Sequence, residues 1–167
     1  MERNETGRAG AQPIYSYWKR MDADYGGRCV ALQYHDGELG SMGVIWGRPS
    51  VTAYIRQSRY TKDFVDQGEY FTISFFDEAY RSALNLCGTV SGRDRDKIKE
   101  AGLTPVDVEG TAAFEEAKLV LLCKKQFHQF MSPDGFDVKE NDTRWYADRD
   151  YHTMYIGSIE KIYKQEA

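Results

Sequence analysis

The segment with the clearest chemical potential is a short basic run in the first half of the sequence. It holds two guanidinium groups, two hydroxyls and an ammonium, on Arg56, Arg59, Ser58, Thr61 and Lys62. The run lies where a strand pattern gives way to a helical one, so unpaired backbone N–H groups adjoin these side chains. Guanidinium groups and helix starts both favour phosphate oxygens. The run is therefore a candidate phosphate site, with a solvated basic turn as the alternative.

A second segment, residues 85–97, combines small and polar residues. Its Gly, Ser and Thr residues let a backbone approach a ligand closely, and Asn85 offers both a hydrogen-bond donor and an acceptor. Asp94 and Lys97 flank the first turn of an expected helix. A ligand-facing loop is one interpretation. A capped connection between two helices is the other, and the segment taken alone favours it.

Other kinds of site have little support in the sequence. Neither a G-x-G-x-x-G motif nor a Walker phosphate loop occurs, and no Ser or Cys lies in a nucleophile elbow. The histidines lack metal-ligand spacing and the cysteines form no C-x-x-C, so we expect no metal site and reduced thiols. The residues concerned are His35, His128, His152, Cys29, Cys87 and Cys123.

Charge and hydropathy exclude two classes of partner. The formal net charge is −4 and no long basic run occurs, whereas nucleic-acid binding needs a concentrated basic surface. No apolar stretch approaches the roughly 20 residues that cross a bilayer, and the polar first residues lack a signal peptide's apolar core. We therefore expect a cytoplasmic protein that binds neither nucleic acid nor membrane.

The elements that must position these segments are mainly strands. Residues 50–56, 70–76, 118–130 and 153–163 are rich in aromatic and β-branched side chains and alternate over much of their length, which is typical of strands. Residues 29–33 are a shorter candidate. Aromatic residues make up 14% of the chain, which also favours a β fold.

Three short helices are expected between the strands. Thr61 is the expected N-cap of a helix over 62–67, residues 79–86 have helical spacing, and Asp94 is the expected N-cap of a helix over 95–101. These elements do not alternate as βαβ units, so a doubly wound sheet is disfavoured. We predict a mainly β fold, a closed or nearly closed antiparallel barrel with small flanking helices.

The domain organisation is simple. No repeat or low-complexity linker divides the chain. A single domain of this length can bury most of the surface that its unfolded chain exposes. We predict a loose N-terminal tail over residues 1–13 and one domain over residues 14–167.

Taken in order, several stretches resemble the flavin reductase-like family of FMN-binding split barrels, which includes flavoredoxin-type proteins. Each stretch is short, and their ordered set is what makes the similarity specific. It runs over roughly residues 14–163. The stretches are WGRP at 46–49, RQSRYT at 56–61, YFTISFF at 70–76, CGTVSGRDRDK at 87–97, GLT at 102–104, FEEA at 114–117 and DYHTMYIG at 150–157.

The resemblance implies an antiparallel, Greek-key-like split β-barrel that forms a homodimer. It also implies bound FMN, with FAD as the alternative flavin, near the subunit interface. The residues it implies for the flavin are Arg56, Ser58, Arg59 and Thr61 at the phosphate, Ser91 and Lys97 approaching the flavin, Asn85, Cys87 and Gly88 along the isoalloxazine, and Trp46 as a wall. A cation at Lys97 or Arg59 would stabilise the reduced ring, and His152 is a candidate for the nicotinamide face.

One stretch departs from the family pattern. Family members commonly carry an N-x-M-T-x-x-W-like run before W-x-x-P, whereas residues 29–35 read CVALQYH, without the Thr or the Trp. Two outcomes are open for residues 31–35. Backbone contacts to the flavin persist, with Tyr34 stacking in place of the Trp, or flavin affinity and hydride transfer are altered.

The implied activity is that of an oxidoreductase in which NAD(P)H delivers hydride to FMN and the reduced flavin passes electrons to an acceptor. The cofactor carries this chemistry, so the protein needs no catalytic acid or base. Two alternatives stay open. One is an FMN-binding electron carrier without its own NAD(P)H reaction, and the other is a split-barrel binding module that has lost the flavin.

Overall fold

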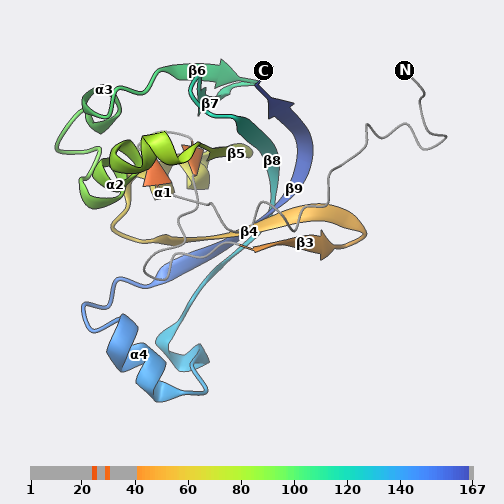
Figure 1. Cartoon of the computed structure of the whole chain (residues 1–167). Helices are drawn as coiled ribbons and strands as arrows, with labels where there is room; N and C mark the ends of the chain where they lie inside the picture. The colour runs from red at the N-terminus through yellow and green to blue at the C-terminus, as the bar shows by residue number, and fades with distance from the viewer. Residues whose placement is uncertain (1–23, 26–28, 31–40, 166–167) are drawn as a thin grey trace.

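The computed structural model describes residues 24–25, 29–30 and 41–165 of the chain. Seven strands form one sheet in the order β1-β2-β5-β8-β9-β4-β3, and β6 pairs separately with β7 (Figure 1). The strands are β1 Asp24–Tyr25, β2 Cys29–Val30, β3 Ser41–Ile45, β4 Arg48–Arg56, β5 Tyr70–Phe75, β6 Pro105–Val108, β7 Thr111–Phe114, β8 Leu119–Phe130 and β9 His152–Lys164. The helices are α1 Tyr60–Gln67, α2 Arg81–Thr89, α3 Lys97–Glu100 and α4 Lys139–Trp145, with 3-10 turns η2 Glu78–Tyr80 and η3 Pro133–Gly135.

The predicted mainly β, antiparallel architecture is confirmed, but the sheet is open. All described strand pairs are antiparallel except β2 with β5. The end strands are β1 and β3, and they do not pair with one another in the part of the chain that the structure describes. The predicted tail 1–13 and the unusual stretch 31–35 lie outside the described residues.

The centre of the sheet owes its stability to alternating apolar residues, as the sequence predicts. Along β4, Val51, Ala53 and Ile55 point into one buried cluster with residues of β5, β8 and β9. A strand places alternate side chains on one face, so this pattern buries three apolar groups and leaves the residues between them partly exposed. The observed strand β4 begins at Arg48, two residues before the predicted start at Ser50, and it ends at Arg56 as predicted.

A second layer covers the other face of β5. There α2, α3 and the β6–β7 ribbon enclose a separate apolar cluster that includes Leu84, Cys87 and Phe114 (Figure 1). This ribbon was not predicted from the sequence, because each of its strands has only four residues. Its turn is carried by Glu109 and Gly110, both with positive φ (52° and 79°), a backbone conformation that suits a tight hairpin.

The outer halves of β8 and β9 extend beyond the rest of the sheet. Pairing of β8 with β5 ends at Lys124, whereas pairing with β9 continues to Phe130. These halves lead into residues 131–151, called the arm here, which contain η3 and α4 and project from the sheet (Figure 1). The arm returns to the sheet at β9, beside the end of β4.

The helix boundaries correct three predictions. Arg59, not Thr61, is the N-cap of α1, and Thr61 is buried in its first turn. Asp96, not Asp94, caps α3, because that helix begins only at Lys97 and the Asp96 carboxylate accepts from the Lys99 N–H. The predicted helix 79–86 is a 3-10 turn followed by α2, which continues through Thr89.

Candidate functional site

The first predicted segment forms the turn between β4 and α1. Arg56 ends β4, where it lies opposite His152 of β9. The Gln57 N–H donates to the Tyr151 carbonyl at 3.1 Å, and Thr61 is 1% exposed. The turn is therefore held against β9 on one side and by the start of α1 on the other, with Ser58 between them.

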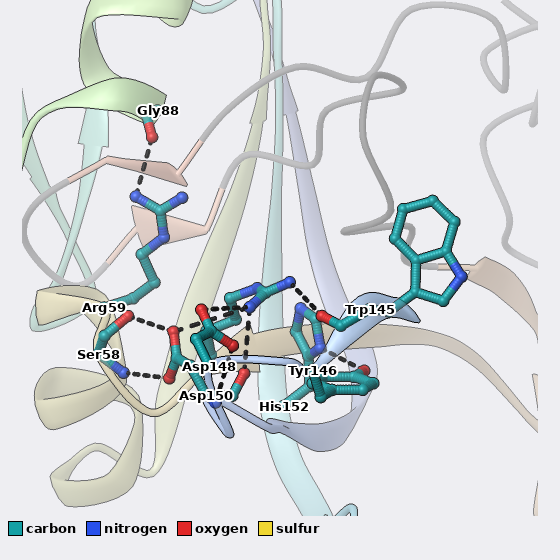
Figure 2. Close-up of polar contacts among 9 residues, drawn as sticks. Ser58, Arg59, Gly88, Trp145, Tyr146, Asp148, Asp150 and His152 are labelled. Atoms are coloured by element: carbon teal, nitrogen blue, oxygen red, sulfur yellow. Dashed lines mark hydrogen bonds and ion pairs between the residues drawn. The ribbon is translucent and has the colours of Figure 1, made fainter. Parts of the chain in front are cut away.

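Ser58 binds both oxygens of a carboxylate from the arm. Its backbone N–H donates to Asp150 Oδ1 at 2.9 Å, and its hydroxyl donates to Asp150 Oδ2 at 2.5 Å (Figure 2). We call these two donors the Ser58 cradle. A phosphate offers oxygens of the same kind to such donors. The cradle thus binds a pair of carboxylate oxygens, and in this structure those oxygens belong to Asp150.

Arg56 fastens the end of the arm to β4. Its Nη1 lies 3.6 Å from Asp148 Oδ2 and 3.9 Å from Asp150 Oδ2. The same guanidinium donates to the carbonyls of Asp150 (3.3 Å) and Trp145 (3.2 Å) and packs 5.5 Å from the centre of the Tyr146 ring (Figure 2). Arg56 and Ser58 therefore face the arm in this structure, and their phosphate role stays a prediction.

Two arginines join the first predicted segment to the second. Arg59 Nη1 donates to the Gly88 carbonyl at 2.8 Å (Figure 2). In the other direction, Arg93 Nη1 donates to the Ser58 carbonyl at 2.8 Å, and its guanidinium packs 4.9 Å from the centre of the Tyr60 ring. The fold thus brings together the two segments that the sequence singled out.

A cavity of about 380 Å³ lies where these segments meet, lined by Tyr60 and residues 92–98. Ser91 lies just before the lining residues, and its hydroxyl oxygen accepts from the Arg93 N–H at 3.2 Å. Asn85 is exposed on α2 and does not line the cavity. Five of the eight residues that line the cavity carry charged side chains, at positions 93–97, so the cavity suits a polar ligand better than an apolar one.

Lys97 is buried although it carries an ammonium group. It is 4% exposed, and its Nζ donates to the Cys87 carbonyl at 2.7 Å. Cys87 lies in the last turns of α2, where unpaired carbonyls favour a cation. The thiol of Cys87 is buried within the apolar cluster under α2. Lys97 therefore ties α3 to α2 at one edge of the cavity.

His152 is buried at the root of the arm. It is 4% exposed, and its Nδ1 lies 2.7 Å from the Tyr146 hydroxyl. Its Nε2 is also buried and has no hydrogen-bond partner among the described residues. Burial, aided by the positive charge of Arg56, lowers the pKa of His152 to about 4. The ring is therefore neutral at pH 7.

Most of the sequence matches the model of a known protein family. Residues 44–167, well over half of the chain, match the family model described as the flavin reductase like domain. The chain belongs to the flavin reductase-like family.

Solved structures support the fold of this flavin reductase-like chain. It is similar to an FMN-binding protein from Thermus thermophilus with bound p-hydroxybenzaldehyde (TM-score 0.62, 17% identity, covering 99% of this chain and 83% of that one). It is also similar to flavoredoxin of Desulfovibrio vulgaris (Miyazaki F) (TM-score 0.61, 20% identity, 99% and 78%). A protein with a split barrel domain from Shewanella frigidimarina is similar as well (TM-score 0.57, 18% identity, 75% and 57%), and these likenesses confirm the predicted split-barrel fold.

Other relatives are longer than this flavin reductase-like chain. Nitrilotriacetate monooxygenase component B from Bacillus cereus is similar with a TM-score of 0.58 and 17% identity over 76% of this chain, but the chain spans only 59% of that protein. No curated protein matches the chain in sequence.

Trp46 lies apart from the other candidates of the flavin reductase-like chain. It occupies the turn of the β3–β4 hairpin with a φ of 51°, followed by Gly47 with a φ of 70°, and is 62% exposed. Arg56 is at the opposite end of β4, a strand of nine residues that spans on the order of 25 Å at roughly 3.3 Å per residue. The hairpin points away from α1 and α2 (Figure 1), so one chain does not bring Trp46 to the cavity.

The acidic residues of this site were not predicted from the sequence. Lys62 pairs with Asp66 and Arg93 pairs with Asp63, both at 2.5 Å. Asp150, which occupies the Ser58 cradle, is 92 positions away from Ser58. No spacing rule connects residues so far apart, and the only signal was that Asp150 opens the DYHTMYIG stretch.

Two further features bear on partners. Among residues 24–25, 29–30 and 41–165, no three His, Cys, Asp or Glu side chains gather as a metal site would require. None of the described helices has the length and apolar character needed to span a membrane.

Proposed function

We propose that this chain binds FMN and acts as an NAD(P)H-dependent flavin reductase that passes electrons to a further acceptor. The observation that carries the proposal is the hydrogen bond from Arg59 to Gly88. It joins the candidate phosphate segment to the candidate ring segment, and Tyr60 of the first segment and residues 92–97 of the second line the cavity of about 380 Å³. Membership of the flavin reductase-like family and the FMN-binding protein among the similar structures support it.

The donor groups of the site suit a flavin phosphate chemically. The Ser58 cradle already binds a pair of carboxylate oxygens, and the next residue, Arg59, extends its guanidinium to the Gly88 carbonyl of the second segment. Phosphate oxygens accept from backbone N–H, hydroxyl and guanidinium donors alike. We propose that the phosphate is held by Arg56, Ser58, Arg59 and Thr61, and the rest of the flavin by Asn85, Cys87, Gly88, Ser91 and Lys97.

When bound, FMN supplies the hydride and electron transfer. The chain contributes binding, orientation and exclusion of water. The burial of Cys87 and Lys97 supports the exclusion of water from this part of the site. The positive charges of Arg59 and Lys97 favour an anionic ligand in a partly buried site.

An electron carrier is the second candidate, and the position of His152 favours it. The ring is 4% exposed and Nε2 is buried, so His152 does not line an open face to which a nicotinamide has access. Under this proposal the chain holds FMN but has no efficient reaction with NAD(P)H. FAD remains the alternative flavin in both cases.

The visible spectrum of the purified protein tests both candidates. Absorption bands of bound flavin are expected, and chromatography of the released flavin separates FMN from FAD. Anaerobic addition of NADH or NADPH should bleach the bands of a reductase, whereas absence of bleaching by either favours the carrier. A colourless protein that binds neither added FMN nor added FAD would contradict both and leave the flavin-free binding module.

We also propose a homodimer in the cytoplasm. Exposed apolar side chains at two places support a subunit interface: Val44 and Trp46 near the β3–β4 turn, and Val138 and Trp145 on the arm. Light scattering on the protein as it elutes from a size-exclusion column should give twice the chain mass of 19.2 kDa. A monomeric mass at micromolar concentration would contradict the dimer.

A further inference from the structure

Asp150 lies on the donors that the proposed phosphate site requires. We infer that Asp150 is a displaceable internal ligand of the Ser58 cradle, so that a phosphate monoester binds there only by releasing the carboxylate. The flavin part of this inference rests on the proposed function.

The contact is specific to Asp150 and is not shared by its acidic neighbour. Both carboxylate oxygens of Asp150 are bound by Ser58, and its side chain is 19% exposed. The Asp148 carboxylate instead lies 3.6 Å from Arg56 Nη1 and accepts from the Asp150 N–H, and its side chain is 65% exposed. Both acids lie near the same guanidinium, but it is Asp150 whose two oxygens are bound by Ser58.

The turn that presents Asp150 includes a residue with a disfavoured backbone conformation. Arg149 has a φ of 60°, a left-handed conformation that residues other than glycine seldom adopt. The Arg149 N–H donates to the Tyr146 carbonyl at 2.8 Å, and the Asp150 N–H donates to Asp148 Oδ1 at 3.1 Å. The Asp150 carboxylate therefore adds a tertiary tie to a backbone turn that is disfavoured on its own, and releasing it also relaxes that turn.

An internal ligand lowers the apparent affinity for an external one. The apparent dissociation constant of the phosphate equals its intrinsic value divided by the fraction of molecules in which the cradle is open. A partly exposed, charge-assisted contact is modest in strength, so its removal should tighten phosphate binding by roughly three- to tenfold. Because the carboxylate belongs to the arm, phosphate binding should also loosen residues 146–150.

The matched pair Asp150→Asn and Asp148→Asn tests the inference. Each removes one negative charge near Arg56, but only Asp150→Asn weakens the contact with Ser58. We expect Asp150→Asn to lower the Kd for FMN by roughly three- to tenfold and to leave the Kd for riboflavin, which has no phosphate, unchanged. Asp148→Asn should change neither Kd by more than about twofold. Equal effects of both variants would indicate simple charge repulsion, and weaker FMN binding by Asp150→Asn would indicate that Asp150 organises the site; either result overturns the inference.

Inorganic phosphate separates this inference from the proposed function. Its binding is followed at the Ser58 amide by NMR, with no flavin present. Perturbation of that amide at a several-fold lower phosphate concentration in Asp150→Asn than in the wild type would support the internal ligand even if neither protein binds flavin. Equal midpoints, or no perturbation in either protein, would overturn it. In the unmodified protein, phosphate should speed amide exchange at residues 146–150, and unchanged exchange at saturation would also count against displacement.

Discussion

Gly157 of β9 and Phe71 of β5 meet across the intervening strand β8. A Cβ atom added at Gly157 would lie 2.6 Å from Phe71 Cζ, 2.8 Å from Phe71 Cε1 and 3.1 Å from Cys123 Cβ. Phe71 is 1% exposed and Cys123 is fully buried. The ring therefore fills the space that a side chain at position 157 would occupy, in the centre of the main core.

Substitution of Gly157 should destabilise the fold. Because a buried ring has little room to move, we expect Gly157→Ala to lower the free energy of unfolding by about 1–3 kcal/mol. Gly43→Ala on β3 is the matched control, since nothing lies within 4 Å of its added Cβ, and its effect should stay within about 0.5 kcal/mol. Urea unfolding measures both. Similar midpoints for the two variants would show that the core accommodates the methyl group.

Lys97 should stabilise the junction between α2 and α3. Lys97→Met keeps the apolar length of the side chain but removes the hydrogen bond to the Cys87 carbonyl. We expect a loss of about 1–3 kcal/mol of unfolding free energy, because a buried acceptor loses a charged donor. Lys99→Met, an exposed position on the same helix, should be nearly neutral. A Lys97→Met variant as stable as the control would contradict this role.

Arg59 should matter for flavin binding more than other surface arginines. Arg59→Ala removes a guanidinium of the candidate phosphate segment together with its link to the Gly88 carbonyl. We expect a roughly tenfold or greater increase in the Kd for FMN, in line with the loss of a charge-assisted hydrogen bond. Arg48→Ala is the control, because Arg48 begins β4 at its other end and its side chain is 68% exposed. Unchanged FMN affinity in Arg59→Ala would place the phosphate site elsewhere.

His152 should make the fold sensitive to acid. Its pKa is about 4 in the folded chain and about 6.5 in the unfolded one. The unfolded state therefore binds more protons as the pH falls from 6.5 towards 4, and stability decreases across that window. Well above pH 6.5 both states are neutral at this residue, so it contributes no pH dependence there.

The variant His152→Gln should lose less stability than the unmodified protein on acidification. Between pH 7 and pH 4.5 we expect the difference to reach about 2 kcal/mol, as the shift in pKa requires. Urea unfolding at several pH values measures it, with His128→Gln, at an exposed position of β8, as the control. Parallel stability profiles for the unmodified protein and His152→Gln would show that this imidazole titrates normally in the folded chain.

Strands with repeated apolar alternation were predictable from sequence, and short elements were not. The pattern along β4 is local, so Val51, Ala53 and Ile55 indicate their shared face without knowledge of any partner strand. The four-residue strands β6 and β7 carry too few positions for such a pattern, and α4 lacks a buried apolar face. Helix α3 begins at Lys97 and not at Arg95, because the side chain that caps it is Asp96 and not the predicted Asp94.

The sequence by itself determined which segments carry the donors of the site. Residues 56–61 and 85–97 were singled out by residue type, and their donors are local properties of the chain. Only the tertiary structure decided what those donors bind. Arg59 faces Gly88, Arg93 faces Ser58, and Asp150 occupies the Ser58 cradle from 92 positions away. Such pairings depend on where β9 and the arm pass the end of β4, and strand packing sets that path, so no local pattern in the sequence records it.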